Sequence, residues 1–482
     1  MYKFGSRQIS FSDFGQPHGM KMSGGNRWVK KAMRIPWDEI EERYAKLFNS
    51  THGNVAKPLR LAFGACIIQS EYGYSDVETA LQIQEGPYLQ FFCGFKEYKD
   101  ELPFDPSLMV HFRKRLTPEI LGEINEMIIT HNDSSGKPPK PPTTSSGKDA
   151  EVSKKSDDSD NGGTLIIDAT CAPSQARYPQ DTSLLNEARE KTEKMIDTLH
   201  TAGEKKARTY RRKARKEYVS FAKTKKKTTK KIRKQIRRQL SYLNRNLEHI
   251  DRQLSHGKEL TERQKKQLEI IRKVYEQQKF MYDRRIHTVP DRIVSINQPW
   301  LRPIVRGKAK EAVEFGAKLD ISVSEGWTRL EELSFNAYNE SGNLQEIIER
   351  FKERTGRYPE RVLADKIYRN RDNLAYCKQY GIRLSGPALG RPKKDEKKDR
   401  KQIYLDACDR IEVERQFSLA KRKCGLGLIT KRLEETTFHC VAMSVVLLNL
   451  RKVLLLLFSY WLLFRSFITN SSGSDRKWAY VQ

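Results

Sequence analysis

Residues 164–170 read TLIIDAT, and residues 361–366 read RVLADK. Each stretch is a short apolar run with an aspartate where the run ends, which is typical of a buried strand that meets its loop. Open α/β sheets place their sites at the C-terminal ends of strands, so we expect Asp168 and Asp365 to lie side by side. Because a lone acid at a strand end is usually a cap or a turn former, a third element is needed to favour chemistry.

That third element lies in residues 410–427, which read RIEVERQFSLAKRKCGLG. Arg410, Glu414 and Lys421 fall near one face of a helix. This face suits work on a phosphodiester, because the carboxylate can hold a metal ion and the cations can hold the strand. The alternative is a surface ion pair between Arg410 and Glu414, worth roughly a few tenths of a kcal/mol.

Two other acids are weaker candidates. Glu412 stands two positions before Glu414, and two positions rotate a helix by about 200°, so only one of them can face the site. The fit with Arg410 and Lys421 favours Glu414. Asp320 lies on the polar side of an alternating stretch, and we expect it to face solvent. Oxygen ligands without His or Cys suit Mg²⁺ or Mn²⁺, so the sequence predicts a site for one of these ions.

The composition predicts a globular protein with a polyanionic partner. A length of 482 residues suggests two or three domains, and a hydrophobic fraction of 37% excludes a wholly disordered chain. The 90 Lys+Arg against 61 Asp+Glu give a net charge of +29. Residues 201–290 hold 29 Lys+Arg and 9 Asp+Glu, a net charge of +20, so one segment makes the protein basic. DNA is the expected partner.

Cysteine usage and the C-terminal apolar stretch indicate a cytoplasmic protein. The seven cysteines are scattered and form no CxxC pair, which is typical of reduced thiols rather than of disulfides or a zinc site. Charged residues interrupt the apolar stretch 445–464 and leave 12 uncharged residues from Val453 to Phe464. A membrane span needs about 20. We therefore expect a buried terminal helix, with a membrane-associated helix as the alternative.

Residues 1–131 are predicted to form a helical, DNA-binding N-terminal domain. In its last expected helix, Arg113 and Arg115 lie beside an apolar stripe and face either DNA or solvent. Residues 132–163 hold no aromatic and almost no aliphatic side chain, which predicts a disordered linker. Periodicity predicts helices in the N-terminal domain at 57–71, 75–85 and 106–116.

The domain that follows is expected to be interrupted by a basic helical hairpin at residues 201–285. Apolar residues repeat in heptad spacing from Ile236 to Leu254, and Thr261 with Gln264 predict a capping box on the second helix. The alternative is a solvated coiled-coil arm that mediates dimerisation. Phosphate contacts are assigned to Lys225, Lys226, Lys227, Lys230 and Lys231.

The interrupted domain itself is expected to be catalytic and to occupy residues 164–200 and 286–468, before a C-terminal tail at 469–482. Apolar and polar residues alternate over 317–323, which predicts a strand with one buried face and one polar face. Further strands are expected at 292–296 and 317–323, a helix at 344–355, and helical structure again from residue 406.

Three blocks of sequence resemble the DDE transposases of bacterial insertion sequences, and more narrowly the insertion-sequence-five group. The resemblance covers residues 35–131, 164–179 and 290–450. The blocks are LIIDATCAPSQARYP with Asp168, VLADKIYRNRDN with Asp365 followed by GIRLSGPALGRP, and VERQFSLAKR with Glu414. The third block also matches a signature of related transposases at Arg410, Glu414 and Lys421, but the tyrosine of that signature is Ala407 here.

The resemblance implies an α/β, ribonuclease H-like catalytic domain: a mixed sheet with helices on both faces. Asp168, Asp365 and Glu414 would hold two Mg²⁺ or Mn²⁺ ions, and Arg410 and Lys421 would hold the DNA strand. The implied activity is cleavage at the ends of an insertion sequence and joining of the free 3′-hydroxyls to target DNA. A homodimer, associated with the bacterial nucleoid and not with a membrane, is the implied form.

Three alternatives stay open. A nuclease of the same fold would cut without joining, and a non-catalytic basic protein would bind DNA through the hairpin alone. A peripheral membrane protein would use Val453–Phe464.

Overall fold

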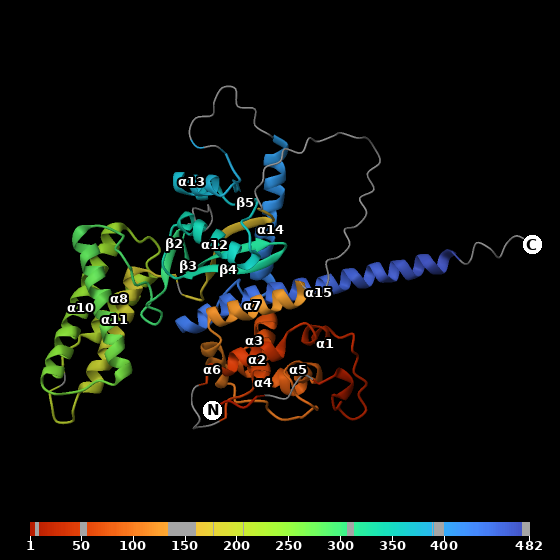
Figure 1. The fold of residues 1–482 in the computed structure, drawn as a ribbon. Coiled ribbons are helices and arrows are strands. Elements are labelled where there is room, and N and C mark those ends of the chain that lie inside the picture. Colours follow the sequence, from red (N-terminus) through yellow and green to blue (C-terminus); the bar gives the residue numbers. More distant parts are fainter. Residues whose placement is uncertain are drawn as a thin grey trace, which may run out of the picture.

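The computed structural model describes residues 1–4, 9–48, 55–133, 161–176, 178–205, 207–305, 313–387, 389 and 400–474, with side chains in the last helix described as far as Leu455. Helices of the N-terminal region lie beneath a mixed sheet, and a helical arm projects to one side (Figure 1). Most of the expected linker (134–160), the end of the expected tail (475–482) and residues 390–399 lie outside the described residues.

The N-terminal region is helical, as its periodicity predicts. Helix α3 is buried along nearly its whole length because its sequence LAFGACII is apolar on every side, and Gly73 ends it in the left-handed conformation with φ of 73°. Ser75 caps the next helix by accepting a hydrogen bond from the backbone of Glu78. The helices are α1 (Arg27–Ala32), α2 (Trp37–Ala45), α3 (Leu59–Tyr72), α4 (Asp76–Glu85), α5 (Pro87–Phe92), α6 (Leu108–Arg115) and α7 (Pro118–Asp133), after a 3₁₀ turn η1 (Phe11–Asp13).

The sheet is mixed and has the order β2-β3-β1-β5-β6, with β4 also paired to β3. Strand β1 runs antiparallel to β3 and parallel to β5, and β6 runs parallel to β5. The architecture is therefore a mixed helix-and-sheet fold. Its strands are β1 (Thr164–Pro173), β2 (Arg302–Val305), β3 (Val313–Ser324), β4 (Trp327–Ser334), β5 (Arg361–Leu363) and β6 (Arg383–Leu384).

Helices cover both faces of this sheet. Leu165 and Ile167 of β1 pack in one cluster with α12 (Leu344–Thr355), whereas Ile166 of the same strand packs in the cluster that holds α14 (Arg400–Lys423). The alternation follows from the period of two along a strand. On the α12 side lie the 3₁₀ turns η2 (Glu340–Asn343) and η3 (Lys366–Tyr368) and helix α13 (Arg371–Gln379).

Two strand expectations need correction. The stretch 292–296 is not a strand; it is an irregular segment whose Ile293, Val294 and Ile296 are buried between the arm and the sheet. Strand β3 is buried on both faces rather than on one, because a helical layer covers each side of the sheet. Polar residues of β3 therefore lie in the interior, although the alternation in the sequence alone predicts that they face solvent.

The arm contains four helices rather than two. The apolar stripe of α10, from Leu240 to Ile250, packs in one cluster with residues of α8 and α11. The predicted boundary at residue 201 therefore cuts through the bundle, and within the described residues this stripe is used inside the chain rather than left for a partner copy. The predicted capping box of Thr261 and Gln264 is confirmed. The helices are α8 (Asp181–Leu199), α9 (Arg211–Lys223), α10 (Thr229–Ser255) and α11 (Glu262–Arg284).

Helix α15 (Glu434–Ser474) joins the N-terminal helices to the sheet, and it lies between them together with α7 (Figure 1). The buried Asn449 donates to the side chain of Asn125 on α7 at 2.8 Å and to the carbonyl of Thr328 on β4 at 2.8 Å. It also accepts from the backbone of Thr328 at 3.0 Å. Three elements distant in sequence are thus fixed by one amide.

One helix, Glu434–Leu455, is long and apolar enough to cross a membrane by length and composition. However, 67% of its apolar window is buried inside the protein, and the core helix of a soluble protein passes the same test. The structure buries residues 441–448 against the N-terminal helices and the sheet. This burial agrees with the expected buried terminal helix, although side chains of 456–464 lie outside the described residues.

Candidate active site

Strand register brings the first two acids to the same level of the sheet. Ile166 of β1 lies opposite Leu363 of β5 in a parallel pair. Two residues further along, the first segment reaches Asp168 and the second reaches Asp365. Asp365 leaves its strand and caps η3, accepting from the backbone of Lys366 at 2.7 Å. The apolar strand followed by a cap thus positions an exposed carboxylate next to the half-buried one.

Burial dominates the electrostatics of Asp168. Burial raises the pKa of this carboxyl above its ordinary value, while the backbone N–H of Ala169, which donates to it at 2.8 Å, and the nearby guanidinium of Arg410 oppose the rise. The charges of Glu340 and Asp365 add to the rise. The charges of Arg410 and Asp365 both act on the pKa of Asp168, so both groups lie near its carboxylate.

Helix α14 supplies the third acid because its apolar side docks on the sheet. Val413 and Phe417 are buried in the same cluster as Ile166 and Ile321. This packing leaves the adjoining side of the helix directed at the ends of β1 and β5.

The side so directed carries the predicted cations and the third acid. The guanidinium of Arg410 lies 3.5 Å from a carboxylate oxygen of Asp365 and 3.7 Å from one of Glu414. About two helical turns beyond Glu414, the Lys421 ammonium donates to the hydroxyl of Thr170 at 3.1 Å. The structure thus places Arg410 beside Asp365 and Glu414, with Asp168 on the neighbouring strand β1 and Lys421 bound to Thr170 of that strand.

Glu412 points elsewhere. Its carboxylate accepts hydrogen bonds from Gln416 at 2.8 Å and from Arg415 at 3.0 Å, both on α14 itself. As the 200° rotation requires, Glu412 and Glu414 lie on different sides of the helix. The placement therefore favours Glu414 over Glu412 as the third acid.

The donor set suits a hard divalent cation in its chemistry, because Asp168, Asp365 and Glu414 offer only carboxylate oxygens. Within the described ranges, no group of three or more His, Cys, Asp or Glu side chains converges on one point. Instead Arg410 lies between two of the acids and offsets their charge.

Asp320 is buried, which corrects the expectation that it faces solvent. It is 0% exposed and accepts from the hydroxyl of Tyr338 at 2.6 Å and from the amide of Asn343 at 3.2 Å. Burial raises its pKa to about 6, against these two hydrogen bonds. Asp320 pairs with Ala169 across the sheet and so faces the side opposite to Asp168.

Arg113 is also buried, which corrects the expectation that it faces DNA. It is 3% exposed, and its guanidinium donates to both oxygens of Asp76, at 2.8 and 2.7 Å, and to Gln69 at 2.8 Å. Burial alone would raise the pKa of Asp76, but the hydrogen bonds from Arg113 and Gln69 outweigh it and lower the pKa to about 2. Arg115 is exposed and lies over the ring of Phe48 at 5.0 Å.

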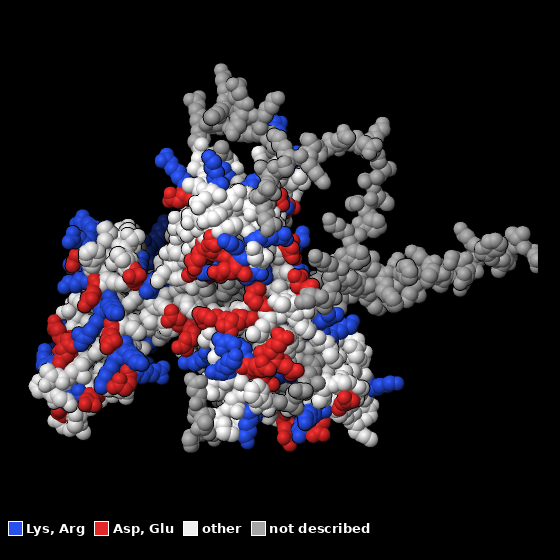
Figure 2. Space-filling model, in the orientation of Figure 1, with Lys and Arg blue, Asp and Glu red and all other residues white. Residues whose placement is uncertain are grey.

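The five predicted phosphate-binding lysines are all exposed. Lys225, Lys226 and Lys227 lie in the loop between α9 and α10, and Lys230 and Lys231 lie in the first turn of α10. Figure 2 shows the arm covered by basic side chains with acidic ones between them. This placement leaves the lysines available to a polyanion.

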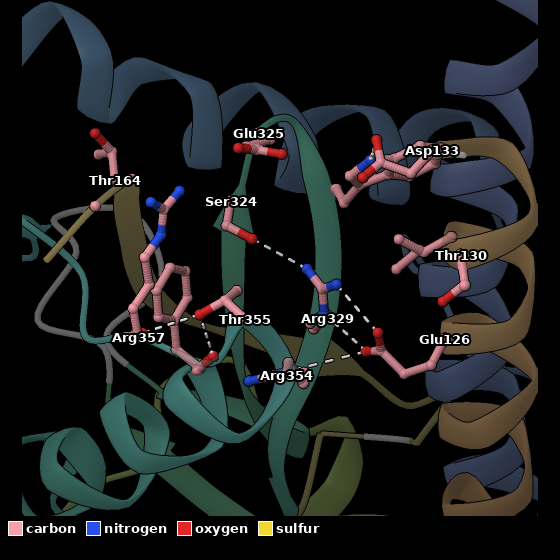
Figure 3. Close-up of a pocket in the computed structure, with 15 residues that line it drawn as sticks. Glu126, Thr130, Asp133, Thr164, Ser324, Glu325, Arg329, Arg354, Thr355 and Arg357 are labelled. Carbon is pink, nitrogen blue, oxygen red and sulfur yellow. Dashed lines mark hydrogen bonds and ion pairs between the residues drawn. The ribbon is translucent and has the colours of Figure 1, made fainter. Parts of the chain in front are cut away.

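A cavity of about 650 Å³ lies apart from the three acids. It lies between α7, the β3–β4 hairpin and α12 (Figure 3). Two of its arginines are engaged: Arg329 donates to Glu126 at 2.7 Å and to Ser324 at 3.0 Å, and Arg354 pairs with Glu331 at 2.8 Å. Because these charged side chains pair with one another where α7, the β3–β4 hairpin and α12 meet, we infer a structural role for them.

Sequence reasoning missed two contributors to the site. Thr170 holds Lys421, and the signal for it was available, since it stands two residues after Asp168 and shares that face of β1. The second is the anchor of α14, Asp406, which accepts from Arg383 at 2.6 and 2.8 Å and lies 3.4 Å from Arg361. No local pattern links those three residues.

Two family models match parts of the chain. A family model described as "Transposase DDE domain" matches residues 362–451, which include Asp365 and Glu414, and one described as "Transposase domain (DUF772)" matches residues 20–115. Two separate regions of the chain are therefore similar to transposase domains, and the second of them is similar to a DDE domain.

A curated relative and the solved structures add less. An uncharacterized protein, ORF8 in the nfe locus of Rhizobium meliloti, is 35% identical over 96 residues, which are 20% of this chain and 46% of that protein. The chain thus matches less than half of the relative's length. No solved structure matches the chain.

Proposed function

We propose that this protein is a DDE transposase that binds the ends of an insertion sequence, cleaves the DNA there with divalent metal ions, and joins the free 3′-hydroxyls to target DNA. The observation that carries the proposal is that Arg410 lies 3.5 Å from Asp365 and 3.7 Å from Glu414, with Asp168 at the same level of the neighbouring strand. The strand order and directions, with helices on both faces, support a ribonuclease H-like fold.

The reaction is an in-line displacement at phosphorus. In cleavage, the oxygen of water bonds to phosphorus, the bond from phosphorus to the 3′ oxygen breaks, and the strand leaves with a 3′-hydroxyl. In joining, that hydroxyl loses its proton, attacks a target phosphorus and displaces a target 3′ oxygen. Asp168, Asp365 and Glu414 would hold two Mg²⁺ or Mn²⁺ ions, whose chemistry is to activate the attacking oxygen and stabilise the leaving one.

The chain's own cations position the phosphodiester. Arg410 carries a charge within reach of Asp365 and Glu414, where a phosphate must come to lie. Lys421, held by Thr170, supplies a second charge along β1. Both would offset the negative charge that builds up on phosphorus oxygens during the displacement. We further infer a homodimer in the active complex and a cytoplasmic location, where its DNA lies.

Cleavage is expected to depend on the metal ion. Treatment with EDTA should abolish strand cleavage, and Mg²⁺ or Mn²⁺ should restore it. Ca²⁺ should not, because its larger radius and looser shell misplace the reacting oxygens. Gel analysis of a labelled duplex measures this, and nicking by metal-free protein would contradict the mechanism. Appearance of strand-transfer products in the same reaction separates a transposase from a nuclease of the same fold.

The loop between α9 and α10 is expected to dominate non-specific affinity. Each neutralised phosphate contributes roughly 0.9 to the slope of log affinity against log salt, so replacing the five lysines by Gln should flatten this slope by a few units. The preference for element ends should survive, since we assign it to the N-terminal helices. The replaced residues are Lys225, Lys226, Lys227, Lys230 and Lys231.

A control variant replaces lysines on the other arm helix, α11, where a similar change of net charge should leave the slope nearly unchanged. Its targets are the exposed Lys265, Lys266, Lys273 and Lys279. Equal flattening in both variants would mean that net charge, not the loop, sets the affinity. Loss of end preference in the five-lysine variant would mean that the arm reads the sequence.

A further inference from the structure

The N-terminal half of α14 exposes apolar residues beside the acids. Ile403, Tyr404 and Ile411 are 54%, 69% and 51% exposed, and Ala407 among them is exposed too. With 3.6 residues per turn, all four positions fall within about 80° of Glu414 around the helix axis. These four residues, the α14 strip, therefore continue the face of the helix on which the third acid lies.

This half of the helix is held firmly from its other side. Within residues 400–412, all of which the structure describes, only Asp406 is buried. Its carboxylate is bound by Arg383 and Arg361, and Asp409 pairs with Arg361 at 2.7 Å. Ion pairs, not apolar packing, thus fix the helix and leave the α14 strip outward.

The surroundings of the strip favour a polyanion over an apolar protein partner. Arg400 lies exposed in the turn that precedes Ile403. Lys366 is exposed directly after Asp365, and Arg410 lies on the strip's own helix between Ala407 and Ile411. Apolar side chains set among cations, next to an acidic site for a phosphodiester, match the two parts of a nucleotide: its base and its phosphate.

We propose that the α14 strip is the base-binding surface of the active site, on which Tyr404 stacks an unpaired nucleobase near the phosphate to be cut. The proposal rests on the proposed function, since it needs DNA at Glu414. A helix rises 1.5 Å per residue, which puts Ile411 about 4.5 Å and Tyr404 about 15 Å from Glu414 along the axis. Stacked nucleotides are 3.4 Å apart, so Tyr404 would meet a base about four nucleotides from the cut.

The test uses binding alone, in EDTA, so that it does not depend on cleavage. The probe is a short duplex with a six-nucleotide unpaired 3′ end that carries 2-aminopurine at one position at a time. Wild-type protein should quench the fluorescence of one or two neighbouring positions. Tyr404→Ala should remove the quenching and weaken binding of the overhang by about tenfold, the effect of one base–aromatic stack.

Matched variants separate stacking from simple apolar contact. Tyr404→Phe and Tyr404→Trp should keep both quenching and affinity, whereas Tyr404→Leu should lose both. Tyr178→Ala removes a tyrosine of similar exposure, 68%, on another part of the chain and should change neither.

Two outcomes would overturn the proposal. Quenching and affinity that survive in Tyr404→Leu would show that no ring stacks there. A change in sedimentation of Tyr404→Ala without any change in quenching would show that the strip binds a second copy of the chain. Failure of the proposed function reads out separately, because normal cleavage by Glu414→Gln would contradict the catalytic assignment and leave the fluorescence result intact.

Discussion

Asp168→Asn, Asp365→Asn and Glu414→Gln are each expected to lower strand cleavage by about 10²–10³-fold or more, while the affinity for DNA changes little. Each substitution removes a carboxylate charge that acts on the transition state but keeps the side-chain volume. Cleavage of a labelled duplex under single-turnover conditions measures the loss, and a gel-shift titration of the same duplex measures binding.

The matched control is Glu412→Gln, which changes the same type of side chain on the same helix. Because Glu412 is bound by Gln416 and Arg415 and not directed at the site, cleavage should stay within about threefold of wild type. If Glu412→Gln abolished cleavage and Glu414→Gln did not, the third acid would be Glu412.

Arg113→Met is expected to destabilise the fold by about 3 kcal/mol and to leave the salt dependence of DNA binding unchanged. The substitution breaks a buried ion pair and leaves the Asp76 carboxylate with Gln69 and Lys431 as its partners. Asp76 is 28% exposed, so the loss falls at the low end of the range for buried pairs. Urea unfolding measures it.

Arg115→Met is the control, since it removes the same charge from an exposed position two residues away. It should cost less than about 0.5 kcal/mol. If Arg113→Met were stable and bound DNA more weakly, this result would support the assignment of Arg113 to the DNA-binding surface.

The same pair predicts a dependence on pH. The pKa of Asp76 is lowered to about 2 in the folded protein, from an ordinary value of 3.8. The contribution of the carboxylate is therefore fully present above about pH 4 and is lost as the pH falls towards 2. Wild type should lose more stability over this interval than Arg113→Met, because the variant lacks the group that lowers the pKa.

The three proposed active-site acids could be singled out from the sequence because their signals are local. An apolar run that ends in an aspartate, and a carboxylate with cations at helical spacing, place Asp168, Asp365 and Glu414 without knowledge of the rest of the chain. Burial is different. Asp320 and Arg113 lie in polar sequence patterns, and each is buried by residues that lie elsewhere in the chain. Tyr338 binds Asp320 of β3, and Asp76 binds Arg113 of α6.

The arm shows the same limit. The heptad stripe of α10 predicts a helix with one apolar side, and the helix is there. What that side packs against could not be read from it, because the partner helix α8 lies outside the basic segment, before residue 201. Packing partners are set by the complementarity of two surfaces, and a single sequence stretch shows only one of them.

The amide of Asn449 binds both Asn125 of the N-terminal helices and Thr328 of the sheet, and so helps to fix the distance between these two parts of the molecule. A fixed distance between the two parts allows no change in the spacing between the bound sequence and the cut. If the N-terminal helices hold the element's end, one base pair inserted between the recognised sequence and the cut moves the phosphate by about 3.4 Å along the duplex. It also turns the phosphate by about a tenth of a turn around the duplex. The cut should then stay at a constant distance from the bound sequence, and the element's own boundary would be defined by the protein's dimensions rather than by the bases at the junction.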